Sequence, residues 1–162
     1  MAPNKNIQSA KRWLALLAWI IASFSAGGIG AFFMPGAWYD ALNKPSWNPP
    51  GWIFGPVWSA LYAMMAVSAW LIWQRGGFPK QSKPLLWFSV QLLLNALWSP
   101  LFFGLHQPGI AFGEILLLWG GIAGTMRAFY PVSRKAVYLL IPYLAWVSFA
   151  AVLNFAIWRL NP

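Results

Sequence analysis

The sequence has few charged residues, and nearly all of them carry the same sign. Only 8% of its 162 residues are charged, and two are acidic, Asp40 and Glu114; soluble domains average about 25% charged residues. Cysteine is absent and His106 is the one histidine. These absences exclude disulfides and thiolate chemistry and leave too few ligands for a metal site. No paired nucleophile and base and no phosphate-binding loop is present, so hydrolysis and phosphoryl transfer have no support.

Apolar residues, in contrast, make up 60% of the chain and give a mean hydropathy of +0.57. A membrane-spanning helix needs about 20 of them in a row. The charge-free runs 14–33, 53–73, 85–105 and 137–158 meet this length, and 109–126 is interrupted only by Glu114. None alternates with the period of two that barrel strands show. We therefore predict an all-α membrane protein, with residues 1–162 forming one domain of five transmembrane helices. The first run is longer than a signal-peptide core, so we expect it to be retained.

The net charge of +9 could indicate nucleic-acid binding. The basic residues, however, flank apolar spans, which favours the lipid bilayer as partner and argues against nucleic acid. With five spans, nine of the eleven bases fall on one side, and only Lys44 and Arg159 fall on the other. Since Lys and Arg accumulate in cytoplasmic loops, we predict a cytoplasmic N-terminus, with the first loop and the C-terminus outside. The nine are Lys5, Lys11, Arg12, Arg75, Lys80, Lys83, Arg127, Arg134 and Lys135.

The first connection contains the segment WYDALNKPSWNPPGW, residues 38–52, with three tryptophans and three prolines. Proline restricts its own φ and extends the preceding residue. Residues 37–43 could form a helical turn in which Asp40 and Lys44 pair. An aromatic belt at the membrane surface is one interpretation, and it suits Trp13, Trp73, Trp87 and Trp158. We favour an ordered lid over the bundle mouth, because long ordered loops are usually functional. Its residues would be Trp38, Lys44, Pro45, Trp47, Asn48, Pro49 and Pro50.

Beneath this loop, three spans carry aromatic and amide side chains on single helical faces, at roughly 6 to 21 Å from their outer ends. Such a combination is typical of small-molecule sites. The alternative is that the amides only bond helices together and the aromatic residues only pack. Pro100 and Pro142 should kink their helices. The candidate ligand-binding residues are Trp58, Tyr62, Gln91, Asn95, Trp98, Trp146, Ala150 and Asn154.

Two further side chains have open roles. Glu114 is a functional candidate because acids within a membrane are costly, although it could also reach water or stay protonated. His106 is expected to cap a helix end. Small residues at helical spacing allow close helix contact, either within the monomer or between two copies. They are Ala22, Ala26 and Gly30, then Gly109 and Gly113, and finally Gly120 and Gly124.

The segments WYDALNKPSWNPPGW, GPVWSALY, QLLLNALWSPLFF and IPYLAWVSFAAVLNFAIWR resemble the translocator protein family (TspO/MBR), which includes the tryptophan-rich sensory proteins and the peripheral-type benzodiazepine receptors. The resemblance extends from Ala31 to Arg159. It implies a five-helix bundle, usually a homodimer, with a porphyrin such as protoporphyrin IX as ligand and no covalently bound cofactor. Benzodiazepine-type drugs and cholesterol are ligands of mitochondrial members. The implied contact positions are Tyr39, Trp58, Tyr62, Asn95, Trp98, Trp146 and Ala150.

The resemblance implies a porphyrin receptor, sensor or transporter of a bacterial cell membrane that regulates tetrapyrrole metabolism. Two alternatives stay open. One is a light-dependent porphyrin-degrading enzyme, in which Tyr62 and Trp98 would relay oxidising equivalents; no other catalytic residue is proposed. The other is a membrane scaffold without ligand. Phe155 stands where the family's proposed cholesterol motif requires an aromatic hydroxyl, and such motifs are weak, so sterol binding is not expected.

Overall fold

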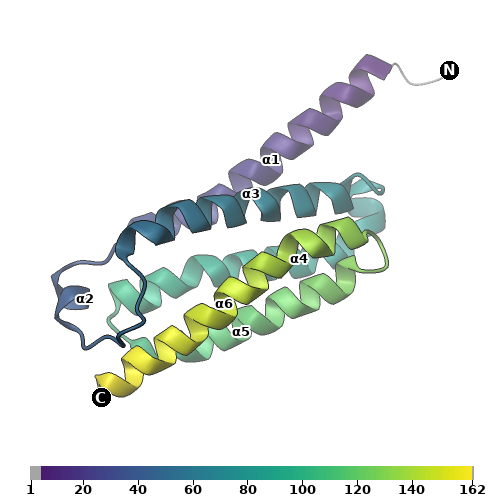
Figure 1. Ribbon diagram of the computed structural model, residues 1–162. Helices are drawn as coiled ribbons and strands as arrows, with labels where there is room; N and C mark the ends of the chain where they lie inside the picture. Colours follow the sequence, from purple (N-terminus) through teal and green to yellow (C-terminus); the bar gives the residue numbers. More distant parts are fainter. Residues whose placement is uncertain (1–4, 162) are drawn as a thin grey trace.

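A computed structural model describes residues 5–161, and this part of the chain is entirely helical outside its turns and loops. Five long helices dominate (Figure 1): α1 (Lys5–Ala31), α3 (Phe54–Trp73), α4 (Gly77–Ser99), α5 (Pro108–Phe129) and α6 (Arg134–Leu160). Three short elements complete the fold: helix α2 (Ala37–Ala41), the 3₁₀ turn η1 (Gly51–Ile53) and the π-helical segment η2 (Pro100–Gly104). All five long helices are long and apolar enough to cross a membrane. The predicted fold class is confirmed.

The helices form a bundle in which α3 and α4 each contact several neighbours. Helix α3 packs against α1, α4 and α6, and α4 also packs against α1 and α5, while α5 and α6 pack together. The N-terminal part of α1 projects beyond the bundle (Figure 1). Helix α1 still contacts α3 at Arg12, whose carbonyl accepts from the indole nitrogen of Trp70 at 3.0 Å.

The long helices extend past most of the predicted spans. Predicted runs 14–33, 109–126 and 137–158 correspond to helices 5–31, 108–129 and 134–160. Apolar content determines the stretch inside the hydrocarbon, whereas backbone hydrogen bonding continues until a turn or cap ends it. At α6 that cap is Ser133, whose hydroxyl oxygen accepts from the backbone nitrogen of Ala136 at 3.4 Å.

Helix α4 departs most from its predicted range, 85–105. It begins at Gly77, is kinked at Gln81, and passes into the π-helical η2 at Pro100. Pro84 explains the kink, because it cannot donate to the turn before it and its ring crowds that turn. Pro100 and Pro142 are the two prolines expected to kink their helices. Pro100 begins η2, and Pro142 lies within α6, which runs from Arg134 to Leu160.

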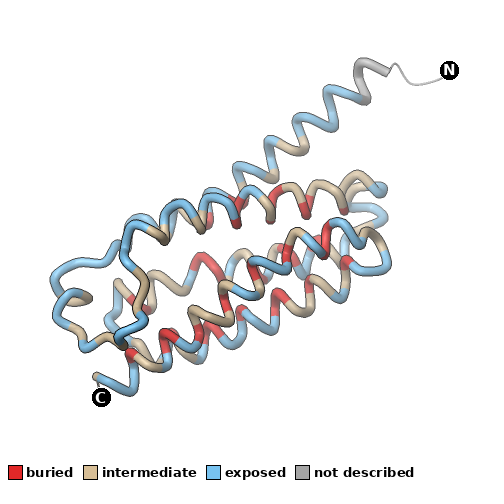
Figure 2. Tube along the Cα trace, viewed as in Figure 1, coloured by how far each residue is buried: buried red, intermediate tan, exposed pale blue. Residues whose placement is uncertain are grey.

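Buried residues line the inner faces of the helices, and the outward faces are exposed (Figure 2). The main core contains Met65, Leu85, Phe88, Ile122 and Tyr143, all fully buried. A smaller cluster lies at the end of the bundle covered by the first loop, around Phe102, Ala111, Leu153 and Ile157. Large apolar side chains exposed on the outside, such as Leu93 at 67%, are what a lipid-facing surface requires.

Several of the small residues are needed inside the monomer. A β-carbon at Gly109 would lie 2.9 Å from the Trp158 ring, and one at Gly30 would lie 3.1 Å from the Ser99 hydroxyl. At Gly113 and Gly120 an added β-carbon would meet no atom of residues 5–161 within 4 Å, apart from the adjacent residues and the backbone of its own helix. Monomer packing therefore accounts for part of the pattern, and a dimer contact stays a prediction for the outward-facing part.

Candidate functional site

The first loop is folded onto the end of the bundle. Trp38 stacks on His106, with ring centroids 4.2 Å apart, and its edge faces Phe102 at 5.8 Å. Trp47 packs edge-on against Phe149 of α6 at 5.9 Å. The position of His106 corrects the expectation that it caps a helix, since Leu105 is the C-cap of η2 and Gln107 is the N-cap of α5. His106 instead has a positive φ of 56° and offers its ring to the loop.

Lys44 organises the loop from within. Its ammonium group donates to the carbonyl oxygens of Tyr39, Asp40 and Leu42 at 2.6, 3.1 and 3.0 Å, and lies 4.7 Å from the centre of the Tyr39 ring. The expected pairing with the Asp40 carboxylate is wrong, because the partner at Asp40 is the backbone carbonyl. The last carbonyls of a helix lack intrahelical donors. In α2, the Lys44 ammonium supplies the hydrogen-bond donors for these carbonyls.

Tyr39 lies between this loop and the bundle. Its hydroxyl donates to the side-chain oxygen of Asn48 at 3.2 Å, and its ring faces Phe102 and Phe103 at 6.2 and 5.4 Å. Burial raises the pKa of Tyr39, the hydrogen bond to Asn48 lowers it, and the charge of Asp40 raises it slightly further. The turn after it is closed by the backbone nitrogen of Asn48, which donates to the carbonyl of Pro45 at 2.9 Å.

One loop contact was not predicted. The backbone nitrogen of Asn43 donates to the side-chain oxygen of Asn161 at 2.9 Å, and the Asn161 amide donates back to the Asn43 carbonyl at 2.9 Å. The same amide also donates to the carbonyl of Ile157 at 2.8 Å. Asn161 thus attaches the loop to the end of α6. No local pattern indicates this pairing, because 118 positions separate the two residues.

Beneath the loop, Asn95 connects three helices. The Tyr62 hydroxyl donates to its side-chain oxygen at 2.8 Å, and its amide donates to the Tyr143 hydroxyl at 3.0 Å. Trp58 stacks on Tyr62 with centroids 5.4 Å apart and meets Tyr143 edge-on at 6.2 Å. Tyr62, Asn95 and Tyr143 are 8%, 7% and 0% exposed, so this cluster is shielded from solvent and lipid.

A second polar chain lies closer to the loop. The Trp98 indole donates to the side-chain oxygen of Asn154 at 3.0 Å, and the Asn154 amide donates to the Pro108 carbonyl at 2.8 Å. Trp98 also stacks on Phe102 at 5.0 Å. Tyr62 and Trp98, the candidate redox relays, therefore belong to two separate hydrogen-bonded groups.

The remaining predicted wall residues lie on α6. Trp146 meets Phe54 and Phe149 at centroid distances of 5.9 and 5.5 Å, and half-buried Ala150 packs against the main core. The structure thus brings the predicted residues of α3, α4 and α6 together under the loop. Their amides at Asn95 and Asn154 already bond helices to one another, so the bonding role holds for these two.

Gln91 is different. Its side chain is 1% exposed and neither of its amide atoms has a hydrogen-bond partner among residues 5–161. The side chains of Glu114, 8% exposed, and Ser23, fully buried, also lack hydrogen-bond partners in this described part of the chain. Leaving a buried polar group unpaired costs about 1–3 kcal/mol, so these side chains have an unused capacity to bind water or a ligand.

Two cavities, of about 530 and 420 Å³, lie at the opposite end of the bundle from the loop. Neither is lined by a predicted ligand-binding residue. The aromatic side chains under the loop contact one another, so a large flat ligand could enter only if they moved.

The fold and this site define a small membrane protein with five spanning helices and a docked loop over an aromatic, amide-containing interior. The chain belongs to the TspO/MBR family, whose model matches residues 14–159. It is 41% identical to the translocator protein of Homo sapiens over 157 residues, covering 94% of this chain and 93% of that protein. It is 43% identical to the tryptophan-rich protein TspO of Chlorobaculum tepidum, covering 94% and 99%. Identity to the tryptophan-rich sensory protein of Cereibacter sphaeroides is 38%, covering 92% of each chain.

Proposed function

We propose that this membrane protein binds a porphyrin between α3, α4 and α6, beneath the first loop, and acts as a sensor or transporter in tetrapyrrole metabolism. The observation that carries the proposal is the Trp58–Tyr62–Asn95–Tyr143 cluster. It places two stacked aromatic rings next to a central amide in a buried space. Flat aromatic walls favour a flat, apolar ligand, and a few amides can orient it. The name of the sensory relative is in keeping with this role.

The basic residues at the loop end also support the binding of a porphyrin there. A porphyrin such as protoporphyrin IX carries carboxylates on one edge, and Lys44 and Arg159 are the two basic residues predicted for this end; the Lys44 ammonium would have to leave the three loop carbonyls to reach a ligand. Entry requires the loop to move. Its attachments are the Asn161 amide, the stacked His106 ring, the Trp47 edge contact, and the aromatic contacts of Trp38 and Tyr39 with Phe102 and Phe103. Opening would expose the interior without breaking the bundle.

The test is a titration of the purified protein with protoporphyrin IX, followed by quenching of tryptophan fluorescence. Wild type should show saturable quenching, and Trp146→Ala should weaken it about tenfold, since an aromatic contact of this kind is worth on the order of 1.5 kcal/mol. The matched control is Trp13→Ala, which removes an indole 63% exposed at the other end of the bundle. Linear quenching that neither variant changes would refute the proposal.

Two further features are proposed on the same footing. The N-terminus is expected in the cytoplasm, from the distribution of basic residues; a reporter fused after Pro162 should then be active only on the outside. A homodimer and benzodiazepine-type ligands stay predictions from the family resemblance. Cross-linking in native membranes, with and without substitution of the outward-facing Gly113 and Gly120, would test the dimer.

A further inference from the structure

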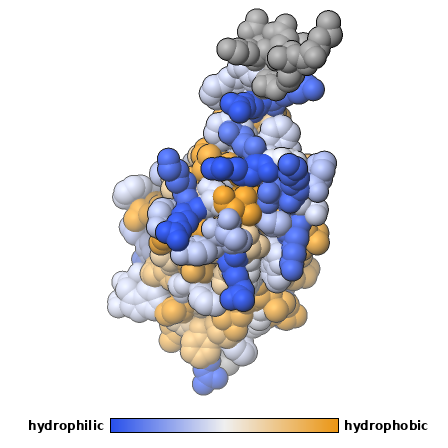
Figure 3. Space-filling view, turned by 90° about the vertical axis from the view of Figure 1, so that its right-hand side faces the viewer, coloured by the Kyte–Doolittle hydropathy of each residue, from blue (hydrophilic) through white to orange (hydrophobic). Residues whose placement is uncertain are grey.

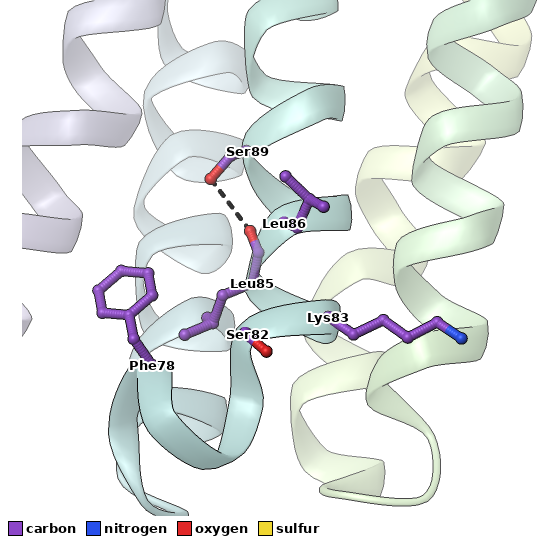
Figure 4. Close-up of a pocket in the computed structure, with 6 residues that line it drawn as sticks. All are labelled: Phe78, Ser82, Lys83, Leu85, Leu86 and Ser89. Carbon is purple, nitrogen blue, oxygen red and sulfur yellow. Dashed lines mark hydrogen bonds between the residues drawn. The ribbon is translucent and has the colours of Figure 1, made fainter.

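The cavity of about 420 Å³ lies at the start of α4, where the kink at Gln81 interrupts the helix. It is lined by Phe78, Ser82, Lys83, Leu85, Leu86 and Ser89 (Figure 4). Phe78 and Lys83 lie on opposite sides of the group, and the Lys83 side chain is extended (Figure 4).

Polar and apolar groups are segregated within the cavity. Ser82 and Lys83 are exposed at its rim, and Leu85 is fully buried at its wall. The Ser89 hydroxyl already donates to the carbonyl of Leu85 at 3.0 Å, whereas the Ser82 hydroxyl and the Lys83 ammonium donate to no group within residues 5–161. Such a site can hold a charged, oxygen-rich group at the rim next to an apolar group.

An exposed apolar stripe continues from the cavity along α4. It consists of Leu86, Val90, Leu93 and Leu97, which are 63%, 40%, 67% and 51% exposed. Their spacing places them on one helical face, and eleven residues of helix span about 16 Å. This is close to half of a hydrocarbon core about 30 Å thick, which is the depth reached by an acyl chain in one leaflet.

The charge around the cavity is of one sign. Lys80, Arg75 and Arg127 lie at the same end of the bundle, and Figure 3 looks onto this end and shows hydrophilic residues spread across it. Both acids of the chain are elsewhere: Asp40 belongs to α2 in the first loop, and Glu114 lies six residues into α5 from the loop end. An anion is therefore favoured here over a zwitterion.

We propose that this cavity is a binding site for an anionic phospholipid. The headgroup phosphate accepts hydrogen bonds from Lys83 and Ser82, and one acyl chain passes between Phe78 and Leu86 onto the exposed stripe of α4. Basic pockets between spanning helices on the cytoplasmic side are known to hold anionic headgroups; this cavity is lined by α4 alone and lies at the end predicted to be cytoplasmic. The site is separate from the loop-covered interior and does not depend on the ligand proposed there.

Native mass spectrometry of the detergent-purified protein can test this with phosphatidylglycerol and phosphatidylcholine of identical acyl chains. We expect wild type to bind phosphatidylglycerol at least fivefold more tightly. Lys83→Gln should weaken phosphatidylglycerol binding about fivefold, which corresponds to about 1 kcal/mol per basic residue, and should leave phosphatidylcholine nearly unchanged. Ser82→Trp fills the cavity without altering charge and should remove the preference.

The matched control is Lys135→Gln, an exposed lysine at the same end that lines neither cavity; it should stay within twofold of wild type. Equal binding of the two lipids would overturn the proposal. So would equal losses in Lys83→Gln and Lys135→Gln, which would indicate general surface charge, or unchanged binding in Ser82→Trp. Glycerol 3-phosphate that competes as well as the lipid would assign the site to a free phosphate ester instead.

Discussion

Gly27 and Gly28 are neighbours on α1 that the bundle treats in opposite ways. A β-carbon on Gly27 would overlap Cε2 of the Tyr62 ring and lie 2.9 Å from Cζ, whereas one on Gly28 would meet nothing within 4 Å. Ordinary carbon contacts lie at about 3.5–4.0 Å. Replacing Gly27 by alanine therefore requires the Tyr62 ring or α1 to move by more than about 0.6 Å.

The ring has little freedom to move. Tyr62 is 8% exposed, stacks on Trp58 and donates its hydroxyl to Asn95. Overpacking of this kind typically costs about 1–3 kcal/mol. Both substitutions gain similar helix propensity, up to about 1 kcal/mol, so this gain cancels when the two variants are compared. Gly27→Ala should be less stable than Gly28→Ala by about 1–3 kcal/mol.

Reversible unfolding in mixed detergent micelles, followed by circular dichroism, gives the free energies of unfolding for both variants. Gly27→Ala should also weaken protoporphyrin binding, because it displaces a wall of the proposed site, while Gly28→Ala should not. Equal free energies of unfolding for the two variants, whether both are unchanged or both are reduced, would refute the reasoning, since they would mean that α1 does not approach Tyr62 closely.

Three other predictions follow from the contacts of the loop and interior. Asn161→Ala removes both bonds to Asn43 and should speed hydrogen exchange in residues 37–53 with no change in the helices; unchanged exchange would mean that the pairing does not hold the loop. Burial raises the pKa of Tyr39, so the docking of its ring should be complete below about pH 10 and should weaken as the pH rises through the folded-state pKa. The difference in phenolate absorbance between wild type and Tyr39→Phe should therefore titrate above about pH 10. A normal pKa would contradict the burial of Tyr39. Asn154→Leu leaves the Trp98 indole without its hydrogen-bond acceptor and should lower the free energy of unfolding by about 0.6–1.7 kcal/mol. Val152→Leu, on the exposed face of α6, should change it little.

The number of spans, their approximate positions and the basic end could be predicted from the sequence. These are local properties, since about 20 apolar residues suffice to cross a bilayer and flanking charges are visible in the chain. The stiff loop was also predictable, because prolines restrict the backbone wherever they stand. The candidate residues on α3, α4 and α6 were found by depth and helical spacing, which depend on one helix at a time.

Only the tertiary structure decided which partners these residues meet. Nothing in the sequence distinguishes the amides of Gln91, Asn95 and Asn154. The fold pairs the amides of Asn95 and Asn154 and leaves that of Gln91 without a hydrogen-bond partner among the described residues. The pairing of Asn43 with Asn161 and the approach of Gly27 to Tyr62 likewise depend on how distant helices are placed. Hydrogen bonds and close packing act within about 4 Å, and a separation in sequence carries no information about distances on that scale until the chain has folded.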